Sequence, residues 1–194
     1  MRFRWRTVFI IIALLLLGAL IGSGIWAMNP RGPMPEALQA LESDANVIVE
    51  TEPWMTFTPR TANPTTGFIL YPGGRVDARS YAPTAKAIAQ AGYFVVIPPM
   101  PLSLAVLNPD AATDVIAAHP EIERWAIGGH SLGGAMAADY VYKQPEAADG
   151  LILWASYPPG GVDLSNRDAL TTLSIYGTEE SGAPEMAAAA AVLP

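Results

Sequence analysis

The sequence predicts an α/β fold, in which a mostly parallel sheet is covered by helices on both faces. Beyond residue 65, short apolar runs alternate with segments of helical periodicity. These runs are continuously apolar, as expected of parallel strands that are buried on both sides. One of them leads through a glycine-rich turn straight into an alanine-rich helix. Ligands of such sheets bind beyond the carboxyl ends of the strands, so we expect the functional site there.

The N-terminal segment, 1–28, is predicted to be a transmembrane anchor. Residues 7–26 carry no charge, and a helix of this length crosses a hydrocarbon core of about 30 Å. Arginines at positions 2, 4 and 6 precede it, which predicts a cytoplasmic N-terminus and an extracytoplasmic body, with the lipid bilayer as partner of residues 7–26. The alternative is a cleaved signal peptide and a secreted protein. We favour a single-pass anchor in the cell membrane, because Ile25 and Trp26 crowd the candidate cleavage site.

Charge and composition exclude several functional classes. The net charge is −7, and residues 31–194 hold all 18 acidic side chains but only 8 of the 11 basic ones, a net charge of −10. This acidic body argues against a nucleic-acid partner. The chain has no cysteine, which excludes disulfides and thiol nucleophiles. Two isolated histidines give no metal-ligand spacing, so we expect no metal or other cofactor. The oligomeric state is left open.

The remaining elements follow in order. A Pro/Gly-rich linker and a short helix at 36–43 occupy residues 29–45, and a single domain is predicted over 46–194. It opens with two candidate antiparallel strands, 46–50 and 54–58. The other predicted strands are 66–71, 93–97, 124–128, 151–155 and 173–176. The predicted helices are 81–91, which stops at Gly92, then 110–119 and 132–143.

The turn between strand 124–128 and helix 132–143 has the pattern Gly129-x-Ser131-x-Gly133. A serine at the apex of a sharp strand-to-helix turn is held clear of both elements, where a substrate can reach it. Residues two before and two after come too close for a Cβ, which explains the glycines. The helix start also directs the amide of Leu132 to the place where negative charge would develop. The pattern therefore predicts a nucleophilic serine at a strand–turn–helix elbow.

Over residues 46–194 the chain resembles the α/β-hydrolase family, of the dienelactone-hydrolase-like or small bacterial serine esterase type. The likeness is carried by segments 69–74, 128–134, 151–155 and 174–180. It implies the α/β-hydrolase fold and hydrolysis of small ester-like molecules by Ser, acid and His in that chain order.

The resemblance implies a role for four residues, and two of these have an alternative. Ser131 would be the nucleophile. The oxyanion hole would combine the amides of Leu132 and Gly74, with Arg75 as the second choice for the latter. The acid would be Glu180, with Glu179 behind it, although relatives usually place an Asp near this position.

The family's third catalytic residue, a histidine, has no match. No histidine follows Glu180. His130 adjoins Ser131 with its side chain expected to point away, in a structural, hydrogen-bonded role, and His119 is expected at the surface at a helix end. The chain therefore looks like a C-terminally truncated hydrolase without the last strand and terminal helix. The alternative is a naturally short, non-catalytic protein. Either way, strand 173–176 would be an exposed edge that favours self-association.

Two functions of different classes follow. The first is a membrane-anchored serine hydrolase acting through an acyl-enzyme on Ser131, weak or inactive as this chain because the histidine is missing. The second is a non-catalytic α/β-hydrolase-like binding or scaffold domain at the membrane surface. A nucleotide-binding loop is disfavoured, because the glycine spacing does not match and no Gly-Lys-[Ser/Thr] occurs. The substrate is not predicted, but five residues are expected to line its pocket: Met100, Trp154, Tyr157, Pro158 and Pro159.

Overall fold

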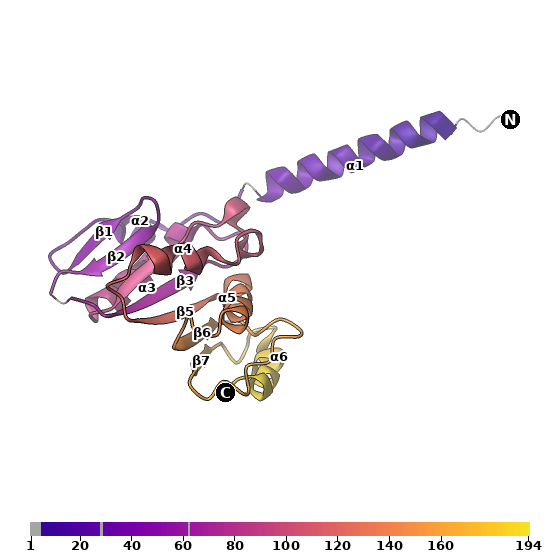
Figure 1. Ribbon diagram of the computed structural model, residues 1–194. Helices are drawn as coiled ribbons and strands as arrows, with labels where there is room; N and C mark the ends of the chain where they lie inside the picture. The colour runs from indigo at the N-terminus through magenta and orange to yellow at the C-terminus, as the bar shows by residue number, and fades with distance from the viewer. Residues whose placement is uncertain (1–4, 28, 62) are drawn as a thin grey trace.

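The computed structural model describes residues 5–27, 29–61 and 63–194, and it places one long helix apart from the rest of the fold (Figure 1). This helix, α1 (Trp5–Ala27), is long and apolar enough to cross a membrane, and none of its apolar stretch is buried. A signal sequence would have the same features, so the choice between anchor and signal stays a prediction. Arg2 and Arg4, on which the predicted topology partly depends, lie outside the described residues.

The domain is built on one sheet of seven strands in the order β1-β2-β4-β3-β5-β6-β7. β1 and β2 pair antiparallel, as predicted, and β2 is also antiparallel to β4. All pairings from β4 through β7 are parallel, so the mostly parallel sheet is confirmed. The strands are β1 (Val47–Glu50), β2 (Met55–Pro59), β3 (Thr66–Tyr71), β4 (Phe94–Ile97), β5 (Arg124–His130), β6 (Gly150–Trp154) and β7 (Thr171–Ile175).

Helices cover both faces of the sheet, as expected. Alternate residues of β3 enter two separate cores, Ile69 on one face and Leu70 on the other. The first core is closed by α4 (Ala111–Ala118) and α5 (Leu132–Lys143), and the second by α3 (Ala82–Gln90). A short helix, α2 (Pro35–Gln39), and the 3-10 turn η1 (Ala78–Tyr81) pack beside α3.

Several boundaries differ from the predictions. β5 continues beyond its predicted end at Gly128 to Gly129 and His130, because Gly129 pairs with both β3 and β6 and His130 pairs with β6. Gly128 lies inside the strand, as predicted, and a Cβ there would collide with the carbonyl oxygen of Ile152. The alanine-rich end, which we expected to lack a helix, forms α6 (Ala183–Ala188) and the 3-10 turn η4 (Ala189–Val192).

The last strand, β7, pairs only with β6 among the described residues, so its other side is an open edge of the sheet. Leu173 and Ile175 on this strand are 50% and 49% exposed. The expected exposed edge is therefore confirmed. Self-association through it remains a prediction.

Candidate active site

The turn between β5 and α5 has the strained geometry that the sequence predicts. Ser131 has φ of 51° and ψ of −122°, a conformation that residues with a Cβ seldom adopt. Its side chain is exposed and lines a pocket of about 340 Å³ at the carboxyl end of the strands. A strained backbone residue whose hydroxyl is exposed at the carboxyl ends of the strands, where ligands of such sheets bind, is the geometry of a nucleophile elbow.

The two glycines of the motif are required by close packing. A Cβ on Gly129 would lie 2.5 Å from the carbonyl oxygen of Tyr71 and 2.6 Å from the carbonyl carbon of Gly133. A Cβ on Gly133 would collide with the carbonyl oxygens of Tyr71 and Pro72. The elbow is thus pressed against the end of β3, which brings the loop after β3 beside the serine.

A buried hydroxyl that the sequence analysis missed holds the elbow from the other side. The Oγ of Ser156 donates a hydrogen bond of 2.7 Å to the carbonyl of Ser131, and the amide of Ser131 donates to the carbonyl of Trp154 at 2.9 Å. Ser156 is only 4% exposed and lies near Gly134, where a Cβ would be 2.6 Å from the Ser156 side chain. Its position just after an apolar strand was the only available signal.

The loop after β3 supplies backbone amides near Ser131. The Gly73 amide donates to the Tyr81 hydroxyl at 2.9 Å, and the Arg75 amide donates to the carbonyl of Ser103 at 2.8 Å. Between them, the Gly74 amide has no acceptor among the described residues, and a Cβ on Gly74 would lie 3.2 Å from Cδ2 of Leu132. Leu132 is the first residue of α5, where a helix leaves its amide unpaired. This arrangement favours Gly74 over Arg75 as the partner of Leu132 in binding an oxyanion.

His130 is hydrogen-bonded beneath the elbow, as the sequence analysis expected. Its Nδ1 lies 2.9 Å from the hydroxyl of Tyr81, which is 7% exposed. Burial lowers the pKa of His130, and the carboxylate of Glu180 partly opposes this shift. Burial also raises the pKa of Tyr81, so the phenol keeps its proton. When neutral His130 carries its own proton on Nε2, its Nδ1 accepts the hydrogen bond from the Tyr81 hydroxyl.

The two candidate acids lie in an exposed turn after β7. The amide of Glu180 donates to the carbonyl of Gly177 at 3.1 Å, and both Glu179 and Glu180 are exposed. The carboxylate of Glu180 acts electrostatically on the pKa of His130, the residue before Ser131. No described histidine contacts either carboxylate in a hydrogen bond or ion pair.

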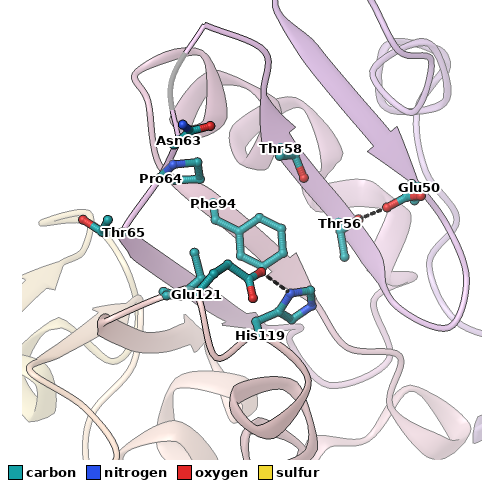
Figure 2. Close-up of a pocket in the computed structure, with 10 residues that line it drawn as sticks. Glu50, Thr56, Thr58, Asn63, Pro64, Thr65, Phe94, His119 and Glu121 are labelled. Atoms are coloured by element: carbon teal, nitrogen blue, oxygen red, sulfur yellow. Dashed lines mark hydrogen bonds and ion pairs between the residues drawn. The ribbon is translucent and has the colours of Figure 1, made fainter.

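His119 lies near the amino ends of β3 and β4, at the opposite end of the strands from Ser131. It caps the C-terminus of α4 and lines a pocket of about 360 Å³ beside the first residues of β3 and β4 (Figure 2). Its Nδ1 is 3.0 Å from Oε1 of Glu121, and its ring centroid is 4.6 Å from that of Phe94. The expected surface position is wrong in part, because packing on Phe94 leaves the side chain only 21% exposed.

Two of the five residues expected in the substrate pocket line it, Tyr157 and Pro159. Trp154 instead packs against Tyr81 and His130 on the other face, and Met100 lines a separate hollow near Pro72. Pro158 is buried. Within the described parts of the chain, no three His, Asp or Glu side chains gather as a metal site would require.

Comparisons with known proteins agree with this geometry. Residues 67–191 match the model of the alpha/beta hydrolase family. A carboxylesterase from Mesorhizobium loti superposes with a TM-score of 0.56 at 16% identity, over 75% of this chain and 82% of that one. A bacterial heroin esterase superposes with a TM-score of 0.50 at 24% identity, over 62% of this chain and 48% of that one. The comparison with curated proteins finds no match.

These structural likenesses show the shared fold, and the chain spans about half the length of the first structures that it matches. The family match covers well over half of the chain and includes the elbow, the loop after β3 and the turn after β7. The chain therefore belongs to the alpha/beta hydrolase family.

Proposed function

We propose that this protein is a membrane-anchored serine hydrolase that cleaves carboxylic esters or related acyl bonds of small molecules through an acyl-enzyme on Ser131. The observation that supports it most is the strained, exposed Ser131 beside the amides of Leu132 and Gly74. We further propose that α1 keeps the domain at the extracytoplasmic side of the cell membrane, or that the domain is secreted if α1 is cleaved.

In the proposed reaction, Oγ of Ser131 forms a bond with the acyl carbon as its proton passes to a base. The negative charge on the former carbonyl oxygen is stabilised by the amides of Leu132 and Gly74. Collapse of this intermediate breaks the bond to the leaving alcohol, which takes up a proton, and water then releases the acid from Ser131. Glu180 would orient the base.

The base is the limiting component of this proposal. The sequence has two histidines, and His119 and His130 are both engaged in other contacts. We propose that neither accepts the proton of Ser131, so these 194 residues hydrolyse esters weakly or not at all. The same observation supports the second candidate function, a non-catalytic domain that binds an ester-like ligand at the membrane surface.

The two functions can be separated by supplying the base in solution. The pocket at Ser131 opens to solvent, so added imidazole can reach the hydroxyl. A hydrolase predicts that imidazole accelerates p-nitrophenyl ester cleavage by the chain beyond the rate with Ser131→Ala, and that Ser165→Ala, at an exposed serine away from the pocket, retains the gain. Equal rates for the chain and Ser131→Ala, with and without imidazole, would support the binding domain.

A further inference from the structure

We propose that the pocket at Ser131 opens at the bilayer surface and receives esters whose apolar acyl chain lies in the membrane. This inference rests on the proposed function and names its substrate class. It comes from contacts between the end of α1 and the loop that carries Gly74.

Arg75 connects α1 directly to the candidate oxyanion loop. Its guanidinium carbon lies 3.7 Å from the centroid of the Trp26 ring, in a cation–π contact. Its Nε donates to the carbonyl of Trp26 at 3.2 Å, and a terminal nitrogen donates to the carbonyl of Asn29 at 3.0 Å. Arg75 follows Gly74, so the last turn of α1 is held one residue from a proposed oxyanion donor.

The backbone makes a second connection. The amide of Arg31 donates to the carbonyl of Arg75 at 2.8 Å, and the amide of Asp77 donates to the carbonyl of Arg31 at 3.0 Å. Arg31 and Val76 thereby form a short parallel bridge. The linker after α1 runs along the loop, so the domain is not on a free tether. The carboxyl ends of the strands, where the elbow lies, must therefore face the end of α1.

An uncharged loop with exposed apolar side chains lies at the same place. Residues 98–109, between β4 and α4, contain no charged residue, although the body as a whole is strongly acidic. This loop includes the 3-10 turns η2 (Pro101–Ser103) and η3 (Ala105–Leu107), and it lies beside the C-terminal end of α1 (Figure 1). Leu102, Val106 and Leu107 are 48%, 51% and 51% exposed. Apolar side chains beside a membrane helix are placed to enter the bilayer interface.

The loop is also packed against the site. The carbonyl of Ser103 accepts the amide of Arg75, and η3 packs on α5, the helix that begins at Leu132. A Cβ on Gly74 would lie 3.8 Å from Cδ2 of Leu104. If the exposed side chains of Leu102, Val106 and Leu107 enter the bilayer interface, Gly74 and the mouth of the pocket lie at the membrane surface with them.

The pocket itself suits an apolar acyl group. Besides Ser131 and Ser156, its walls are Leu132, Ala135, Ala155, Tyr157 and Pro159, so it contains no charged side chain. The Ser156 hydroxyl already donates its hydrogen bond to the carbonyl of Ser131. The walls therefore offer no partner for a charged acyl group, and burial of an alkyl chain is what they favour.

The orientation can be tested without catalysis. The chain has no cysteine, so Leu107→Cys can carry a single NBD fluorophore. Tyr93→Cys is a matched control, because Tyr93 is 48% exposed and lies just before β4, at the opposite end of the strand from the elbow. In phosphatidylcholine vesicles that contain doxyl-labelled lipid, we expect quenching of the label at 107 and not at 93. Equal quenching at both positions would overturn the proposed orientation.

The substrate class is tested with hexadecyl and ethyl fluorophosphonates on the full chain in the same vesicles, with imidazole present and Ser131→Ala as control. We expect the hexadecyl probe to label Ser131 about tenfold faster, and Leu107→Asp, but not Tyr93→Asp, to reduce this preference severalfold. Labelling by both probes at one rate would overturn the inference and leave the hydrolase function standing. Labelling by neither probe would overturn the hydrolase function and, with it, the substrate class.

Discussion

The hydroxyl of Tyr81 lies 2.9 Å from Nδ1 of His130, and this contact joins the start of α3 to the residue before the nucleophile. The same oxygen accepts the buried amide of Gly73 at 2.9 Å. One side chain thus holds both parts of the candidate site, the elbow and the oxyanion loop, in register.

We expect Tyr81→Phe to lower the free energy of unfolding by about 1–3 kcal/mol, because it leaves the buried amide of Gly73 without an acceptor. Urea unfolding followed by circular dichroism measures this loss. Tyr142→Phe, on the exposed side of α5, is the control and should change little. A Tyr81→Phe variant as stable as the parent chain would show that the contact does not hold the loop.

Gly133→Ala should destabilise the domain by about 1–3 kcal/mol or prevent its folding, because the new methyl group meets the carbonyl oxygens of Tyr71 and Pro72. Gly160→Ala is the matched control, since no atom lies within 4 Å of its added Cβ. Thermal unfolding of the two variants distinguishes them. Equal midpoints would contradict the close approach of the elbow to β3.

His130 predicts a pH dependence of stability. Burial lowers its pKa in the folded chain below the value of 6.5 expected when unfolded, so the unfolded state binds the proton more readily. The stability due to neutral His130 is therefore complete above pH 6.5 and is lost as pH falls through the lower pKa of the folded state. Unfolding measured between pH 7.5 and 5 should show this decline, and His130→Asn should flatten it. A slope unchanged in His130→Asn would assign the decline to other groups.

The open edge of β7 predicts self-association of the full chain in detergent. Leu173→Lys places a charge on this edge and should shift the sedimentation profile toward the monomer. The same substitution at Tyr93, which is similarly exposed but lies away from β7, should not. A monomeric parent chain would contradict the prediction.

Features set by local pattern were predictable from the sequence. β3 and α5 have the predicted bounds, and Ser131 occupies the strained turn that its flanking glycines indicated. Features set by partners distant in sequence were not predictable. The extension of β5 to His130 depends on pairing with Trp154. The hydrogen bonds of Ser156 and Tyr81 to the elbow depend on partners 25 and 49 residues away in the chain.

The choice between Gly74 and Arg75 is a further example. Both amides follow β3, and the sequence left the second as an alternative. Only the loop that follows β4, which takes up the Arg75 amide at Ser103, distinguishes them. The choice of Glu180 over Glu179 as the acid stays a prediction from the resemblance, because neither carboxylate forms a hydrogen bond or ion pair with a described histidine.

The most direct test of the central claim is mass-spectrometric detection of a fluorophosphonate adduct on the folded chain. A serine hydrolase elbow predicts an adduct on Ser131 that forms slowly, forms faster with imidazole and is absent from Ser131→Ala. No adduct on Ser131 with or without imidazole would contradict the claim and leave a binding domain. Rapid labelling without imidazole, abolished by His130→Asn, would contradict the structural role assigned to His130.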